Sequence, residues 1–421
     1  MASLLVLGCM WGDEAKAKIV DYLAGPADYV VRFQGGSNAG HTIVTEGKKY
    51  VFHTVPSGIL YPKIKCLIGA GVLIDLESLA HELEALKQAG VAIGKSRLVI
   101  DFRAALVLPL HKELDSAHEN QLGTSRIGTT RRGIGPAYSD LTARVGIRLE
   151  DLEHPQYLFK RLAQLYEYHN IDITPDQIEL EAARLLVLWK SLKKYLGNVE
   201  KILYEANKKD KNILFEGAQG ALLDLNFGSY PYVTSSRVMT DAIGTGTGFS
   251  ARRVDEVMGV YKAYCTRVGE GPFVTELTDD IATRIRTIGN EFGTTTGRPR
   301  RIGWFDAVMG RQSARINGLD HFAITCLDVL SGLKELKICH AYEYKGVVST
   351  WPENHLVEYD KVKPVYQVFP GWEEDISNCK NFKDLPPNAQ NYLKAIHYYL
   401  DTPLTIVSVG KDRKQTFILE D

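Results

Sequence analysis

Residues 4–18 read LLVLGCMWGDEAKAK, and this stretch joins an apolar run to a polar loop that contains glycine. The run Leu4-Leu5-Val6-Leu7 is short and aliphatic, which is typical of a buried β-strand. The loop is expected to open a helix, whose first N–H groups form an anion site reinforced by Lys16 and Lys18. A helix start with two surface lysines is the plainer interpretation of the same residues.

The same loop differs from a P-loop. It lacks the G-x-x-x-x-G-K-[ST] pattern, so no hydroxyl follows the lysine to hold Mg²⁺. Asp13 is the candidate metal ligand instead, because hard cations prefer carboxylate oxygens. Beside Mg²⁺ and two lysines, the pKa of Asp13 is expected to be low. A generic GTPase switch protein is therefore a weak alternative.

Short apolar or β-branched runs alternate with helical patterns along the rest of the chain, which favours an α/β fold. We predict a large central, mostly parallel β-sheet flanked by helices, with helical and loop insertions. The predicted strands are residues 4–7, 29–33, 66–68, 98–101, 213–215, 256–263, 322–326 and 404–407.

Two helices stand out in the sequence. Asp75 can cap the first, and Gly90 is expected to end it. The second begins after Thr174-Pro175, and Gly197 is a candidate interruption. Their apolar stripes are Leu76, Leu79, Leu83 and Leu86 in the first helix, and Ile178, Ala182, Leu185, Trp189 and Leu192 in the second. Residues 1–421 are predicted to form a single domain, with a helix-rich insertion at roughly 151–211.

Composition narrows the class of protein. The 421 residues are 45% hydrophobic and 24% charged with a net charge of −1, as in ordinary globular proteins. The charge balance predicts no nucleic-acid partner and no polybasic membrane patch. No apolar run reaches the ~18 residues of a membrane-spanning helix, so no membrane association is expected.

The six cysteines are scattered without a C-x-x-C pair. This distribution indicates reduced thiols in a cytoplasmic protein rather than a disulfide framework or a zinc site. The N-terminal segment is too short and lacks the basic start of a signal peptide.

Glycines cluster in polar loops that follow predicted strands, at residues 35–36, 128–135, 217–220, 244–248 and 293–303. In open α/β sheets, ligands bind beyond the carboxyl ends of strands, so these loops predict a large site for several ligands. In the loop 32–42, Asn38 and His41 offer directional hydrogen bonds, and His41 is a candidate donor to a phosphate. A buried structural histidine is the simpler alternative.

Gly-Asp-Glu-x-Lys-x-Lys followed by Asn-Ala-Gly-His-Thr resembles the adenylosuccinate synthetase family. Further segments resemble that family in the same order, essentially from end to end. They are residues 127–138, 215–220, 230–236, 266–273, 289–301, 327–329 and 408–413.

The resemblance implies a ligase of purine biosynthesis, acting in de novo AMP synthesis and salvage. It would join IMP to L-aspartate at the expense of GTP, through 6-phosphoryl-IMP, to give adenylosuccinate, GDP and phosphate. The implied catalytic residues are Asp13 as general base, His41 and Gln219. One Mg²⁺ per subunit would bind Asp13 and Gly40, and GTP is a co-substrate. The implied assembly is a homodimer in which Arg144 reaches the neighbouring site.

The substrate residues are likewise implied by the resemblance. Those for GTP are Gly12, Asp13, Glu14, Ala15, Lys16, Ala17, Lys18, Gly40, His41, Thr42, Arg300, Cys326, Leu327, Asp328, Ser408, Val409 and Gly410. Those for IMP are Asp13, Lys16, Asn38, Ala39, Gly40, His41, Thr130, Arg144, Gln219, Thr234, Val268 and Arg298. Those for aspartate are Thr294, Thr295, Thr296, Gly297, Arg298, Pro299 and Arg300, since arginine forks suit a dicarboxylate.

The chain departs from the family pattern on the nucleotide side. Ala15 and Ala17 stand where glycines are usual, and either alanine would be strained if its φ were positive. Cys326 replaces the usual lysine before Leu-Asp-Val, and Arg131 replaces a glycine. Residues 141–145 lack a lysine and a second arginine.

These departures leave two alternatives open. One is a diverged paralog with another nucleotide donor, such as ATP, or another purine monophosphate. Asp13 argues against the branch that uses a 2-amino purine, while Asp328 favours guanine. The other is a non-catalytic protein that binds nucleotides.

Overall fold

The computed structural model describes residues 3–294, 297–352 and 356–419, and its centre is a ten-stranded sheet. All of its ladders are parallel except the last pair, β18 and β19. The strands lie in the order β19 (Thr416–Ile418), β18 (Leu404–Ser408), β14 (His321–Thr325), β9 (Glu256–Lys262), β1 (Ser3–Gly8), β8 (Ile213–Glu216), β2 (Tyr29–Arg32), β5 (Lys65–Ile68), β6 (Leu98–Asp101) and β7 (Leu196–Gly197).

The predicted fold class is confirmed, and each predicted strand lies in this sheet. Their near-continuous apolar runs suit strands that are buried on both faces; every residue of β1 is buried. Within this sheet, the sequence prediction missed β7 and β19. They are too short, at two and three residues, to show a hydrophobic pattern of their own.

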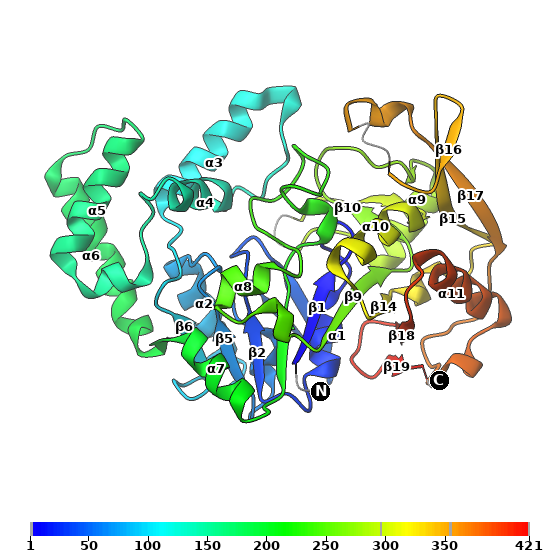
Figure 1. Cartoon of the computed structure of the whole chain (residues 1–421), viewed down its shortest axis with the longest axis horizontal. Coiled ribbons are helices and arrows are strands. Elements are labelled where there is room, and N and C mark those ends of the chain that lie inside the picture. Colours follow the sequence, from blue (N-terminus) through cyan, green and yellow to red (C-terminus); the bar gives the residue numbers. More distant parts are fainter. Residues whose placement is uncertain (1–2, 295–296, 353–355, 420–421) are drawn as a thin grey trace.

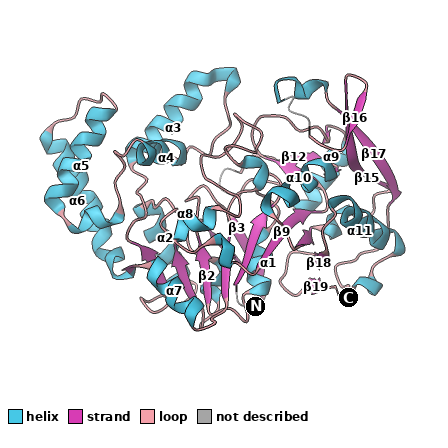
Figure 2. Cartoon of the chain, viewed as in Figure 1, coloured by secondary structure: helices cyan, strands magenta, loops and turns pink. Residues whose placement is uncertain are grey.

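Helices cover both faces of the sheet (Figures 1 and 2). Within the described residues the α-helices are α1 (Lys16–Leu23), α2 (Leu76–Gln88), α3 (Pro109–Leu122), α4 (Ile134–Thr142), α5 (Pro155–Tyr168), α6 (Pro175–Leu192), α7 (Val199–Lys208), α8 (Ala242–Thr247), α9 (Asp280–Gly289), α10 (Ala307–Asn317) and α11 (Pro387–Leu400). Among them, no helix is long and apolar enough to cross a membrane.

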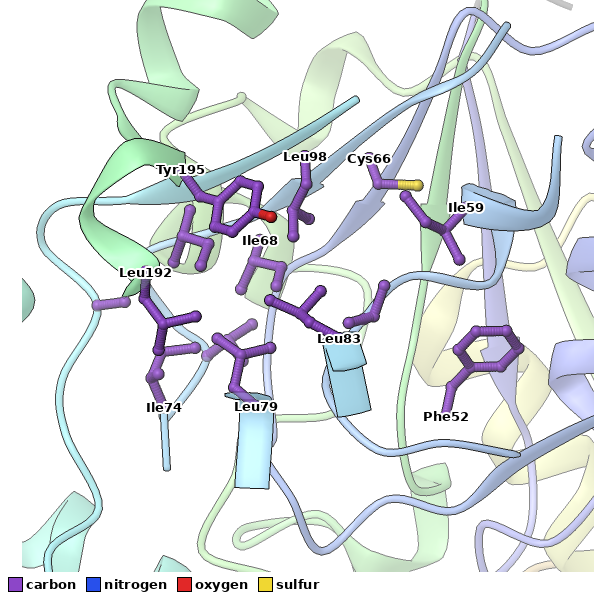
Figure 3. Close-up of a cluster of buried hydrophobic side chains, with 14 of the residues drawn as sticks. Phe52, Ile59, Cys66, Ile68, Ile74, Leu79, Leu83, Leu98, Leu192 and Tyr195 are labelled. Atoms are coloured by element: carbon purple, nitrogen blue, oxygen red, sulfur yellow. The ribbon is translucent and has the colours of Figure 1, made fainter. Parts of the chain in front are cut away.

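Side-chain alternation along β1 explains the two covered faces. Leu4 and Val6 share a buried cluster with side chains of α1 and α2. Leu5 and Leu7, which point to the opposite face, share another cluster with side chains of α7 and α8. Figure 3 shows part of the first cluster, in which Leu79 and Leu83 of α2 lie beside Ile68 and Leu98 of the sheet.

The two predicted helices are α2 and α6. Asp75 accepts a hydrogen bond from the Ser78 N–H at 3.1 Å, which confirms the predicted cap of α2. The predicted role of Gly197 is wrong. The helix α6 ends at Leu192 and a single 3-10 turn follows, so Gly197 lies beyond the helix, in β7.

Residues 151–211 include α5, α6 and α7. In Figure 1, α5 and α6 lie at one end of the molecule and α7 lies against the sheet. Leu158 and Leu162 of α5 and Leu185 of α6 belong to the same buried cluster as the sheet residues. The segment is therefore joined to the rest of the chain by a continuous apolar core.

Three smaller sheets surround the large one. A hairpin of β3 (His41–Thr45) and β4 (Lys48–Phe52) follows β2. A second sheet contains β10 (Cys265–Arg267), β11 (Glu276–Leu277) and β12 (Arg301–Gly303). A third contains β13 (Phe305–Asp306), β15 (Glu335–Tyr344), β16 (Val347–Ser349) and β17 (Lys363–Pro370).

Candidate active site

The site lies at the carboxyl edge of the large sheet. The strands β9, β1, β8 and β2 are neighbours and parallel, so their following loops leave from the same edge. The loops after β2 and β8 carry two of the glycine-rich segments, at residues 35–36 and 217–220, and this edge is where open α/β sheets bind their ligands.

Lys16 and Lys18, both in helix α1, form hydrogen bonds with other groups of the protein. The Lys16 ammonium donates to Glu14 at 2.9 Å and to the Gly12 carbonyl at 3.0 Å. Glu14 in turn accepts from the backbone N–H groups of Met10 and Gly12. Lys16 and Glu14 therefore brace the loop from inside, which helps a glycine-poor loop hold its shape.

Lys18 points toward the strand β18. Its ammonium donates to Ser408 Oγ at 2.6 Å and to the carbonyls of Gly410 at 2.5 Å and Gln415 at 3.2 Å. Burial lowers the pKa of Lys18 to about 8, and the charge of Asp328 opposes this shift. The structure thus gathers Lys18, Asp328, Ser408 and Gly410 at the ends of β14 and β18.

The two alanine departures differ in conformation. Ala15 has φ 59° and ψ 35°, in the left-handed region, while Ala17 lies inside α1. Only Ala15 therefore carries the strain that a glycine would avoid, about 1 kcal/mol. Cys326 also has a positive φ, 59°, in the turn between β14 and Leu327. The Glu14 carbonyl accepts from the Thr325 hydroxyl at 2.8 Å, which ties that turn to the first loop.

Asp13 lies beside Arg300. Its Oδ2 is 3.3 Å from Arg300 Nε, yet neither atom has a hydrogen-bond partner among the described residues, and both are buried. The low pKa expected of Asp13 beside Mg²⁺ stays a prediction, and the protein groups by themselves act in the other direction. Burial raises the pKa of Asp13, and the opposing charges are Lys262 and Arg300 rather than the two lysines of the loop. An orphaned, buried carboxylate oxygen is a fitting ligand for a hard cation such as Mg²⁺.

His41 begins β3 and is held by a carboxylate that the sequence analysis did not identify. Its Nδ1 lies 2.5 Å from Oε1 of Glu216, at the carboxyl end of β8. Glu216 also accepts from the N–H and the hydroxyl of Ser57. Burial lowers the pKa of His41, and Glu216 opposes this shift. A charged residue at the end of an apolar strand was the available signal for Glu216.

A cavity of about 500 Å³ opens at this edge. The predicted site residues that line it are Gly12, Asp13, Asn38, Ala39, Gly40, His41, Thr130, Gln219, Thr234, Val268, Thr294, Arg298 and Arg300. They come from seven separate segments of the chain, so folding brings most of the predicted IMP set together with part of the aspartate loop.

Other predicted residues lie outside the cavity lining. They are Glu14, Ala15, Lys16, Ala17, Lys18, Thr42, Arg144, Gly297, Pro299, Cys326, Leu327, Asp328, Ser408, Val409 and Gly410. Thr42 lies in β3, and Arg144 is exposed after α4. Thr295 and Thr296 lie outside the described residues. The residues predicted to bind GTP therefore extend from the first loop to the ends of β14 and β18.

Gln219 and Asn38 meet at the cavity wall. Gln219 Nε2 donates to Asn38 Oδ1 at 3.1 Å, and its Oε1 is buried without a partner among the described residues. Gln219 has a positive φ, 57°, which turns the chain sharply after β8. The pair presents an amide edge that can recognise a polar ring.

Two acids on α3 hold the opposite wall, and sequence reasoning missed both. Glu119 accepts from the N–H groups of residues 127–129 at 2.9–3.2 Å. Asp115 accepts from the Thr129 hydroxyl and the Gly133 N–H, each at 2.9 Å. Their spacing of one helical turn was the signal. Arg131 has φ 54° and donates to Asn120 at 3.1 Å, on the outside of this wall.

The aspartate loop is joined to that wall and to the sheet. Arg298 donates to the Gly128 carbonyl at 2.8 Å. Arg300 Nη1 lies 2.5 Å from Glu291, which also accepts from Lys262 at 2.8 Å. Burial opposes ionisation of Glu291, but the charges of Lys262 and Arg300 hold its pKa below its usual value.

Comparison with known proteins gives one consistent result. A family model described as adenylosuccinate synthetase matches residues 5–417. The adenylosuccinate synthetase of Desulforamulus reducens is 47% identical, covering 100% of this chain and 99% of that protein. That of Pelotomaculum thermopropionicum is 47% identical, covering 99% of each.

Two solved structures are also similar. The fully ligated adenylosuccinate synthetase from Plasmodium falciparum has a TM-score of 0.92 and 36% identity, covering 100% of both chains. The succinoaminodeoxyadenylate synthetase of cyanophage S-2L, bound to dGMP and dATP, has a TM-score of 0.64 and 20% identity, covering 99% of this chain and 94% of that one. The second likeness concerns the fold alone.

Proposed function

The chain belongs to the adenylosuccinate synthetase family and is a ligase that forms a C–N bond, and on that premise we propose how its residues act. GTP, IMP and L-aspartate meet around Asp13, whose orphaned Oδ2 is the observation that carries the proposal. This buried oxygen has the charge of Arg300 at 3.3 Å but no hydrogen bond, so it can still take a metal ion or a proton, and both are available in this reaction.

In the first step, Asp13 accepts the N1 proton of IMP while O6 attacks the γ-phosphorus of GTP. A bond forms between O6 and phosphorus, and the bond from phosphorus to the GDP oxygen breaks. The deprotonated purine is the better nucleophile, because the negative charge is shared with O6. Gln219 and Asn38 would hold the purine edge, and His41 would donate from Nε2 to the transferring phosphoryl group.

In the second step, the amine of aspartate attacks C6, the bond from C6 to O6 breaks, and phosphate leaves with O6 and with the proton that the amine loses. Phosphorylation is needed because an unmodified ring oxygen is a poor leaving group. Arg298 and Arg300 would bind the carboxylates of aspartate, with Thr294 to Gly297 and Pro299 completing the loop. IMP would also contact Thr130, Thr234, Val268 and the backbone at Ala39.

Asp13 and the Gly40 carbonyl would hold one Mg²⁺ per subunit. The ion supplies positive charge to the phosphoryl oxygens as charge builds up on them.

The guanine pocket lies at the ends of β14 and β18. Asp328 would accept from guanine N1 and N2, while Leu327, Ser408, Val409 and Gly410 would line the base. The phosphates would lie over the start of α1, from Gly12 to Lys18, with Thr42 beside them.

The assembly proposed is a homodimer in which Arg144 reaches the partner's IMP. Its exposed position after α4 supports this role. The six free cysteines support a cytoplasmic location. The continuous core between α5, α6 and the sheet supports one domain over residues 1–421, with 151–211 as an insertion.

The test is release of phosphate from GTP. Release is expected only when IMP and aspartate are both present, together with formation of adenylosuccinate. A parallel reaction with ATP tests the alternative donor, which Cys326 leaves open. Binding of IMP or GTP without turnover under any of these conditions would favour the non-catalytic alternative.

A further inference from the structure

Glu291 is the centre of a buried charge network beside the cavity. It follows α9 and is 1% exposed. It accepts from Lys262 Nζ at 2.8 Å, from the Tyr264 hydroxyl at 2.5 Å and from Arg300 Nη1 at 2.5 Å. Three side chains therefore hold the Glu291 carboxylate in one position.

Glu291 and Arg300 also close the base of the aspartate loop through their backbones. The Arg300 N–H donates to the Glu291 carbonyl at 2.9 Å, and Phe292 and Pro299 form a bridge one residue further in. The same two residues are thus joined twice, once by main chain and once by side chains. These two connections fix the orientation of the Arg300 guanidinium relative to the aspartate loop.

The other side of the Arg300 guanidinium faces the reaction site. Its Nε lies 3.3 Å from Asp13 Oδ2 without forming a hydrogen bond, and Arg300 lines the cavity. The Nε itself is buried, but the side chain as a whole is 16% exposed and lines the cavity, so other atoms of the guanidinium can meet a ligand there while shielded from bulk water. A donor in this position suits an anionic group.

The neighbouring residue, Arg301, can be compared with Arg300. Arg301 begins β12 and pairs with Glu276 through Nε at 2.7 Å, but it does not line the cavity. Successive side chains of an extended chain point to opposite sides, so two adjacent arginines pair with two different acids. Of these two pairs, only that of Arg300 and Glu291 reaches the cavity, and it does so through Arg300.

We propose that Glu291 is a positioning residue for L-aspartate, acting through Arg300; this inference rests on the proposed function. Glu291 holds one edge of the guanidinium, so that the remaining N–H groups face the cavity. Without that anchor, Arg300 would turn further toward Asp13, with which it already pairs at 3.3 Å, and add hydrogen bonds to that ion pair. That ion pair would remove the donor meant for aspartate and occupy the carboxylate that serves the purine.

The test compares Glu291→Gln with Glu276→Gln by steady-state kinetics. Glutamine keeps the shape but loses the charge. For Glu291→Gln, the KM for aspartate should rise by about tenfold or more, while the KM for IMP changes little. Glu276→Gln should leave the KM for aspartate near its original value. An equal effect of both substitutions would overturn the proposal, since Glu291 would then contribute only to stability.

Two further variants separate positioning from structure. Glu291→Asp keeps the charge and should recover part of the lost aspartate affinity. Adding Glu291→Gln to Arg300→Met should change the KM for aspartate by less than about twofold, because residues that act through one another are not additive. The proposal would be contradicted if the effects of the two substitutions on the KM for L-aspartate were fully additive. It would also be contradicted if Glu291→Asp recovered none of the lost affinity.

A binding measurement tests the role of Glu291 even if the protein does not catalyse the proposed reaction. If the unaltered protein releases no phosphate, the function fails, and calorimetric titration with L-aspartate in the presence of IMP still tests the role of Glu291. Weaker binding in Glu291→Gln than in Glu276→Gln supports the proposal, and equal binding overturns it. Thermal unfolding of each variant shows whether it is folded.

Discussion

Nδ1 of His41 lies 2.5 Å from Oε1 of Glu216, although the two residues are 175 positions apart in the chain. This contact fixes the imidazole and leaves Nε2 for the cavity. Burial would raise the pKa of Glu216, but the hydrogen bond and charge of His41, with the charge of Arg32, hold it below its usual value. Burial keeps the pKa of His41 below its usual value despite Glu216, and the charge of an arriving phosphate would act with Glu216 in favour of the protonated imidazole.

The first prediction concerns this pair. Glu216→Gln should lower kcat by about tenfold to a hundredfold, because an oriented donor to a phosphoryl group is lost. Ser57→Ala is the matched control, since it removes a hydrogen bond to Glu216 without touching His41. Phosphate release with saturating substrates measures both, and equal kcat values would show that the pair does not support catalysis.

The second prediction concerns the two alanines. Ala15→Gly should raise the free energy of unfolding by up to about 1 kcal/mol, because glycine adopts the left-handed backbone without strain. Ala17→Gly should lower it by about 0.5–1 kcal/mol, because glycine weakens a helix. Urea unfolding at equilibrium measures both values. Changes of the same sign would contradict the different φ angles.

The third prediction concerns Lys18. Lys18→Met should raise the KM for GTP by about tenfold, because three hydrogen bonds that hold the segment from Ser408 to Gln415 are lost. Lys414→Met is the control, since Lys414 lies exposed in the same segment. Steady-state kinetics at saturating IMP and aspartate tests this. If the two variants have the same KM for GTP, Lys18 does not position the nucleotide pocket.

The fourth prediction concerns Asp306, which caps α10 through the N–H groups of Val308 and Met309 and accepts from the Tyr342 hydroxyl. Burial raises its pKa from 3.8 to about 6. The folded state therefore binds the proton more tightly than the unfolded state. This stabilisation is present at low pH and is lost as pH rises from about 4 to 6, by an amount on the order of 3 kcal/mol.

Asp306→Asn should remove this pH dependence and unfold at a higher urea concentration than the unaltered protein at pH 7. Asp279→Asn, at the exposed cap of α9, controls for loss of a capping carboxylate outside the core. Urea unfolding at pH 5 and pH 7 gives the comparison. The expectation fails if Asp306→Asn keeps the difference in stability between the two pH values.

The sequence by itself determined eight strands of the large sheet, the helices α2 and α6, and the order of the site loops. Apolar runs such as 4–7 and 213–215, the cap at Asp75 and the glycine loops after strands depend on neighbouring residues, so they can be recognised locally. Two short motifs, at residues 12–18 and 38–42, also sufficed to place Asp13 and His41 in one family pattern.

Only the tertiary structure decided which charged groups meet. It directed Lys18 to β18, joined His41 to Glu216 and Arg300 to Glu291, and showed that Ala15 rather than Ala17 has a positive φ. These outcomes depend on the packing of strands and loops that are distant in the sequence. The energy of a buried charge depends on the neighbours that folding supplies, and no local pattern records them.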